Sequence, residues 1–189
     1  MRKSQLIYQY IREQGAVSKQ DIVIGLGLSL PTITQNLNNL AELGLIDTSK
    51  KISNTGGRNA TAYSYIEKAR YAVGLYLNRH HINCVAVDLS GNVISLIRVR
   101  ENFDLNDDNY LRKIGETVEE VKKDTGLSDD RFLGVGIAVQ GLISDDGERV
   151  TYGLTLNFTG VTRADIAKYI PYHNRLFGSS RLCGSMGQK

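Results

Sequence analysis

SKQDIVIGLGLSLPTITQNLNNLAELGLI, residues 18–46, is the stretch that decides the fold of the first part of the chain. Ser18 and Asp21 have the spacing of a capping box, which predicts the start of a helix. Gly27 is expected to end this helix, and a second helix begins about three residues later. This spacing is typical of a helix-turn-helix that reads DNA, although periodicity alone would also allow an ordinary helical hairpin with a solvated face.

The second helix has clear ends and two different faces. Ser29 is a candidate N-cap, Pro31 is tolerated in the first turn, and Gly44 can end the helix in the left-handed conformation. One face is apolar and is expected to be buried; it carries Ile33, Leu37 and Leu40. The other face carries amides and hydroxyls, and amides pair well with adenine in the major groove. The residues of this helix that we expect to contact DNA are Ser29, Pro31, Thr32, Thr34, Gln35, Asn38 and Asn39.

The flanking residues extend this pair of helices to a winged helix-turn-helix. Upstream, residues 6–11 carry apolar side chains at helical spacing and Gly15 follows. Downstream, residues 45–46 and 63–65 are predicted to form the two strands of a hairpin. Lys50, Lys51 and Arg58 lie between them, beside a pair of glycines, and are expected to contact the phosphate backbone or the minor groove. An ordinary surface turn is the alternative interpretation of this segment.

Composition and charge limit the class of protein to which the chain can belong. The chain has 189 residues, 41% of them apolar, and a net charge of +3. Residues 1–70 hold nine Lys or Arg against five Asp or Glu, so the positive excess lies in the first part. Because this excess is modest, we expect a homodimer that reads two half-sites of double-stranded DNA. No segment is apolar enough to span a membrane, and no secretory segment opens the chain, so a cytoplasmic location is expected.

The second region starts near Tyr71, after a charged connector at residues 67–70. Residues 71–77, 82–89 and 92–100 are predicted to form three consecutive antiparallel strands. A helix over residues 108–125 and a buried strand over residues 132–139 follow. This order predicts an α/β half-domain. Cys84 is expected to be a small buried hydrophobe, since the two cysteines have neither disulfide nor zinc-ligand spacing.

Several motifs of the chain resemble the ROK family of bacterial repressors and sugar kinases. The resemblance rests on Leu28-Ser29 with residues 32–34, on Gly44-Leu45-Ile46, on the wing Thr55-Gly56-Gly57-Arg58, on residues 87–91, and on the Gly-x-Gly strand of residues 134–143. It implies an α+β winged helix-turn-helix (residues 1–66), a linker (67–70) and a partial lobe of an actin-like ATPase, ribonuclease H-like α/β fold (71–177). Residues 178–189 are expected to form an irregular tail.

The departures from the family pattern concern catalysis and ligands. Where family kinases have a glycine phosphate loop, this chain has residues 76–80, without the acidic residue or the glycines, so binding of magnesium and ATP phosphates is expected to be lost. His80 and His81 are interpreted as turn residues, and no metal site, cofactor or catalytic group is predicted. Gln140, Gly141 and Asn157 are the sugar-binding candidates that the resemblance implies, and Phe158 replaces the family's aromatic residue.

The carboxylates Asp88, Asp145, Asp146 and Asp165 are each predicted to serve local turns, so the chain is expected not to be an enzyme. The resemblance further implies the family's catalytic Asp, a Cys-rich zinc segment and a second lobe; because none follows Phe177, the chain is expected to be truncated within its effector domain.

The hypothesis from sequence is a sequence-specific DNA-binding transcriptional regulator, a repressor of carbohydrate-utilisation genes with a sugar as its effector. A sugar-binding or sugar-kinase-derived ROK module is the alternative. A third possibility is a product that inactivates intact homologues by mixed dimerisation.

Overall fold

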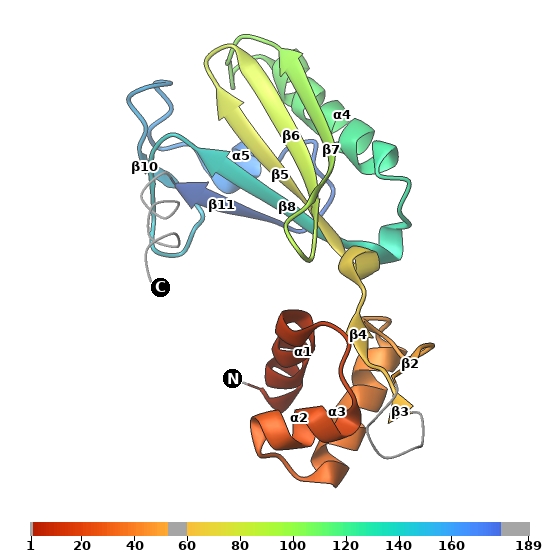
Figure 1. The fold of residues 1–189 in the computed structure, drawn as a ribbon. Helices are drawn as coiled ribbons and strands as arrows, with labels where there is room; N and C mark the ends of the chain where they lie inside the picture. The colour runs from red at the N-terminus through yellow and green to blue at the C-terminus, as the bar shows by residue number, and fades with distance from the viewer. Residues whose placement is uncertain (1, 53–59, 179–189) are drawn as a thin grey trace. The chain divides into compact units, whose positions relative to one another are not determined.

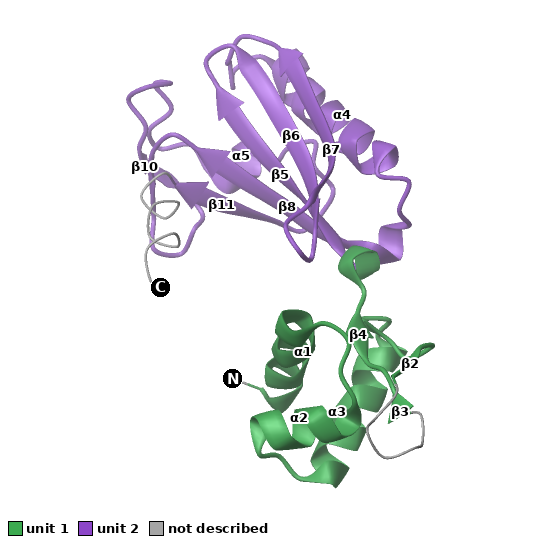
Figure 2. Ribbon diagram, viewed as in Figure 1, with its two compact units in different colours: residues 1–69 green, residues 70–189 purple. Residues whose placement is uncertain are grey.

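The computed structural model describes residues 2–52 and 60–178 (Figure 1). The chain divides into two compact units, residues 1–69 and residues 70–189, which Figure 2 colours green and purple. Each unit has its own hydrophobic core, and no residue is shared between the two cores.

The first unit begins with three helices, α1 (Lys3–Gln14), α2 (Lys19–Leu26) and α3 (Leu30–Glu42). The apolar face predicted for α3 is buried and packs with α1 and α2 in one core, which includes Ile7, Ile11, Ile22, Ile33, Leu37 and Leu40. The predicted capping box opens α2. Gly27 and Gly44 have φ values of 62° and 65°, so both use the left-handed conformation expected after a helix.

Short strands follow the helices. β1 (Ile46–Asp47) pairs antiparallel with β4 (Ser64–Tyr65), which confirms the predicted hairpin with its strands displaced by about one residue. A second pair, β2 (Lys51–Ile52) with β3 (Ala60–Thr61), was not predicted. The connector expected at residues 67–70 contains a 3-10 helix, η1 (Glu67–Ala69), rather than a plain linker.

The second unit is built on a five-stranded sheet with the order β11-β8-β5-β6-β7. β5 (Tyr71–Asn78), β6 (His81–Asp88) and β7 (Val93–Arg100) form the predicted antiparallel meander, and β8 (Phe132–Val139) pairs parallel with β5. Burial alternates along β5 and β6, because one face of the sheet packs against the core and the other does not. Cys84 is fully buried on the core face, as predicted.

One long helix covers the buried face of the sheet. α4 (Asp108–Asp124) packs against β5, β6 and β7 and buries Ile114, Val118 and Val121. Gly115 lets α4 approach the backbone near Tyr169 closely, since a Cβ at position 115 would lie 2.4 Å from the Tyr169 carbonyl oxygen. The short elements η2 (Asp129–Arg131) and α5 (Arg163–Ile166) complete this side (Figure 1).

Three short strands were not predicted. β9 (Leu142–Ile143) pairs with β10 (Val150–Tyr152), and β11 (Asn174–Gly178) adds to β8 in parallel as an edge of the sheet. β11 includes Gly178, so the expectation that the irregular tail begins at residue 178 was wrong by one residue. The reason is that the carbonyl and amide of a strand residue can pair with β8 whatever the side chain. Residues 179–189 of the expected tail lie outside the described residues.

Candidate nucleic-acid interface

The polar face of α3 is accessible. Pro31, Gln35, Asn38 and Asn39 are exposed, while Thr32 and Thr34 are half-buried at its flanks. Within the described part of the chain, the side-chain amides of Gln35, Asn38 and Asn39 make no hydrogen bond, whereas the Asn36 amide donates to the Thr32 carbonyl (2.7 Å). Three neighbouring amides therefore keep their donors and acceptors for a ligand.

The hydroxyl groups of this helix are already engaged. Ser29 occupies the N-cap position, but its Oγ bonds the Thr32 Oγ1 (2.9 Å) and caps no backbone amide. Thr34 Oγ1 donates to the Leu30 carbonyl (2.8 Å). Ser29 therefore has the N-cap position predicted for it, but its side chain does not cap the helix, because the neighbouring hydroxyl offers a competing partner. The amides rather than the hydroxyls are the free groups of α3.

The wing candidates are described only in part. Lys50 and Lys51 are exposed, and the Lys50 carbonyl accepts a hydrogen bond from the Ala62 amide (2.9 Å), which extends the pairing of β2 with β3 by one residue. Arg58 and the glycines of the wing motif lie outside the described residues.

A shallow cleft of about 290 Å³ lies beside the start of α3. Its lining joins the first turn of α2 to strand β3 and consists of Ser18, Lys19, Gln20, Leu30, Ala60, Thr61 and Tyr63. Lys19 and Gln20 were not singled out from the sequence, and the structure places them in this lining. Leu30 is 51% exposed here, which makes it an accessible apolar group next to the amide face.

Each sugar-binding candidate of the second unit has a different local environment. Gln140 Nε2 donates to the Tyr76 hydroxyl. Gly141 packs so closely that a Cβ would lie 2.5 Å from the Tyr152 carbonyl oxygen. Asn157 is exposed in a turn with a φ of 51°.

Phe158, which we expected to replace the family's sugar-site aromatic residue, is 3% exposed and belongs to the core. Its ring packs edge-on against the Phe103 ring, with centroids 5.5 Å apart. A buried ring has no free face for a sugar, so that expectation was wrong. Asn157, the residue before it, is exposed.

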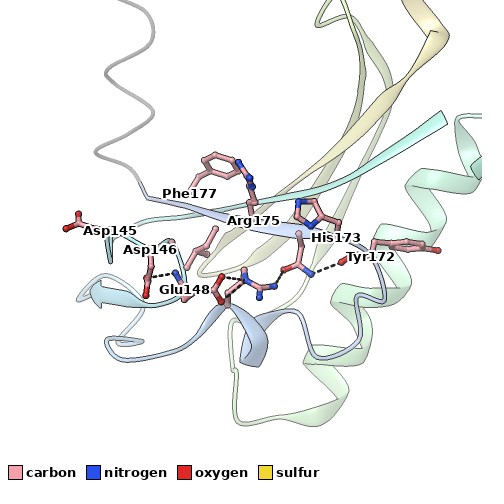
Figure 3. A pocket seen from close by; sticks show the side chains of 11 residues that line it. Asp145, Asp146, Glu148, Tyr172, His173, Arg175 and Phe177 are labelled. Atoms are coloured by element: carbon pink, nitrogen blue, oxygen red, sulfur yellow. Dashed lines mark hydrogen bonds and ion pairs between the residues drawn. The ribbon is translucent and has the colours of Figure 1, made fainter. Parts of the chain in front are cut away.

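A polar cavity of about 520 Å³ lies between the loop of residues 144–149 and β11 (Figure 3). The Arg163 side chain is part of its lining and donates to Glu148 (3.0 Å) and to Asn174 Oδ1 (2.7 Å). Asp146 accepts from the Glu148 amide (3.0 Å) and so closes its own turn. Arg163 thus links the loop, through Glu148, to β11, through Asn174, and its hydrogen bonds hold the loop, α5 and β11 together.

His80 lies in the turn after β5, as expected, but the interpretation of His81 as a turn residue was wrong: it is the first residue of β6, because it pairs with Asn78 of β5 and Arg100 of β7. The carboxylates Asp88 and Asp165 have local roles. Asp88 accepts from the Ser90 and Asn92 amides after β6; burial alone would raise its pKa, but these hydrogen bonds outweigh it and lower the pKa. Asp165 caps α5 through Thr162, as predicted for a local role. Among the described residues no group of three or more His, Cys, Asp or Glu could hold a metal ion, and no helix is long and apolar enough to cross a membrane.

Comparison with known proteins shows which proteins the chain resembles. No family model matches the chain. The chain has the fold of a ROK family transcriptional regulator described as a homologue of the Escherichia coli MLC protein, with a TM-score of 0.69 and 18% identity over 94% of this chain and 45% of that one.

Two curated regulators are also similar in sequence. The DNA-binding transcriptional dual regulator NagC of Escherichia coli K12 and the N-acetylglucosamine repressor of Shigella flexneri are each 23% identical over 167 residues. These matches cover 79% of this chain and 36% of each relative, so the chain spans about a third of their length. The resemblance to ROK-type regulators that we expected from the sequence is confirmed.

Proposed function

We propose that this chain is a sequence-specific DNA-binding transcriptional regulator, a repressor of carbohydrate-utilisation genes. Its first unit acts as a winged helix-turn-helix. α3 enters the major groove, and Lys50, Lys51 and Arg58 contact the phosphate backbone beside it. The observation that carries this proposal is the row of exposed, unbonded amides on Gln35, Asn38 and Asn39.

The packing of the first unit supports this role. α3 is held by a core that its apolar face shares with α1 and α2, so its polar face is presented on a rigid element. The positive excess of residues 1–70 supplies the sequence-independent part of the affinity. Because this excess is small, the proposal includes a homodimer that binds two half-sites. The similar regulators named for N-acetylglucosamine support a sugar as the effector of the second unit.

The test is selection from a pool of random duplexes with the whole chain, followed by anisotropy titration of the selected duplex at several salt concentrations. We expect enrichment of a two-fold symmetric site and binding that weakens steeply as salt rises. Failure to enrich any sequence, or binding that does not depend on salt, would overturn the proposal.

A further inference from the structure

A basic cluster lies at the end of the meander in the second unit, where β6 begins and β7 ends. β6 and β7 pair so that His81 is opposite Arg100 and Asn83 is opposite Arg98. Opposite residues of an antiparallel pair lie on the same face, with Cβ atoms about 4.5–5.5 Å apart. His81, Arg98 and Arg100 therefore share one face. α4 leaves this face of the sheet uncovered. Ile82, which lies between His81 and Asn83 on β6, points to the opposite face and is fully buried there.

The groups of the cluster contact one another directly. Arg98 Nη2 lies 3.2 Å from His81 Nδ1. A guanidinium group only donates, so this imidazole nitrogen accepts and the ring proton is on Nε2, which leaves that N–H free. The hairpin turn is held in place as well, because the Asn78 side chain accepts from the His80 and His81 amides and the Glu101 amide donates to the His80 carbonyl.

Positive charge is uncompensated here. Across the described ranges, five ion pairs join Arg or Lys to a carboxylate in the second unit, and none of them includes Arg98 or Arg100. The pKa of His81 is lowered, first by burial and then by the charges of Arg98, Arg100 and His80, all of them basic. Like charges held side by side on a sheet destabilise it. A dianion seated between them would relieve this repulsion.

We propose that the basic cluster of His81, Arg98 and Arg100 binds a phosphate dianion, either free phosphate or the phosphate group of a small phosphorylated metabolite. A guanidinium group can bind two phosphate oxygens at once, so two arginines on one face suit this ligand, and the imidazole supplies a further donor. All of these donors are side chains, so the site differs from the glycine phosphate loop that the sequence lacks at the same turn. The proposal is independent of DNA binding by the first unit.

The experiment titrates the whole chain with inorganic phosphate at constant ionic strength, by calorimetry and by the NMR signals of the histidine rings. Saturable binding is expected, with a rise in the pKa of His81 because an adjacent anion favours the imidazolium form. Arg98→Gln and Arg100→Gln should each weaken binding about tenfold. Arg175→Gln is the matched control, since Arg175 is an exposed arginine on the opposite edge strand and should leave binding unchanged.

Two further arms identify the source of the phosphate and separate this proposal from the proposed function. Tighter binding of glucose 6-phosphate than of inorganic phosphate would support a phosphorylated metabolite, and equal binding would support free phosphate. Equal affinity in all variants, or an unchanged His81 pKa, would overturn the proposal. Loss of duplex binding in Arg98→Gln and Arg100→Gln would also overturn it, by assigning the cluster to DNA, whereas the proposed function would stand.

Discussion

Gln35 is the residue of α3 whose side chain has the clearest freedom to read a base, because its amide is exposed and makes no hydrogen bond in the described part of the chain. Gln35→Ala is expected to reduce discrimination at one base pair of the selected site by about 1–3 kcal/mol. The measurement is the affinity for the site and its single-base variants. Gln14→Ala, at the exposed end of α1, is the control, and a base preference that Gln35→Ala leaves intact would remove Gln35 from the reading face.

Lys51 is expected to act through charge alone. Lys51→Ala should weaken binding to all duplexes by a similar factor and should lower the slope of log K against log salt by about one. Anisotropy titrations over a series of salt concentrations measure this slope. Gln35→Ala should leave the slope unchanged, so the two variants control each other. A loss confined to one sequence would contradict the assignment of Lys51 to the backbone.

At the scale of elements, two helices of the first unit begin with serine, but only one serine caps its helix. Ser18 Oγ accepts from the Asp21 amide at the start of α2, whereas Ser29 caps no amide at the start of α3. Ser18→Ala is therefore expected to lower the stability of the first unit by about 0.5–2 kcal/mol, and Ser29→Ala by much less. Chemical denaturation of both variants measures the difference. Equal losses would show that the capping bond contributes nothing.

The capping box also predicts a pH dependence. Hydrogen bonds from the Ser18 side chain and backbone lower the pKa of Asp21 below its ordinary value of 3.8. A carboxyl group with a lowered pKa stabilises the folded state above its unfolded pKa, and this contribution is lost as the pH falls through the folded pKa. The gap in stability between the wild type and Ser18→Ala should therefore shrink below pH 3.8. A gap that stays constant down to the acid limit would count against this.

In the second unit, the approach of α4 to the segment after α5 depends on Gly115. Gly115→Ala would place a methyl group 2.4 Å from a backbone oxygen, which no side-chain rotation can relieve. We expect it to destabilise this unit by about 1–3 kcal/mol. Glu116→Ala, at the exposed neighbouring position, is the control and should change stability by less than about 0.5 kcal/mol. Thermal unfolding separates the two, and equal effects would show that the helix can shift.

At the scale of the whole molecule, the two units have separate cores and are expected to unfold in separate cooperative transitions. Ile22→Ala, which removes a fully buried side chain of the first core, should lower only one transition, by about 2–5 kcal/mol. Gly115→Ala should lower only the other. Differential scanning calorimetry of the two variants provides the measurement. A single transition that both variants shift together would contradict two independent units.

Much of this architecture follows from local signals in the sequence. The apolar periodicity of α3 and α4, the alternation of β5 and β6, and the capping box of α2 each depend on side chains a few residues apart, so the sequence alone determined these elements and the polar face of α3. The strands β2, β3, β9 and β10 have only two or three residues each, too few to carry a visible pattern. β11 has five residues, but its partner β8 lies about 40 positions earlier in the chain, so local spacing does not show the pairing.

Only the tertiary structure decided which polar groups are free. The Ser29 and Thr34 hydroxyls bond residues three and four positions away, which local spacing allows but does not require, and only the structure shows that these bonds form and that Phe158 is buried. The sequence also does not bring His81 next to Arg98, because the register of β6 against β7 makes that contact between residues 17 positions apart. The physical reason is that an element forms from local spacing, whereas the availability of a group depends on every neighbour that folding brings to it.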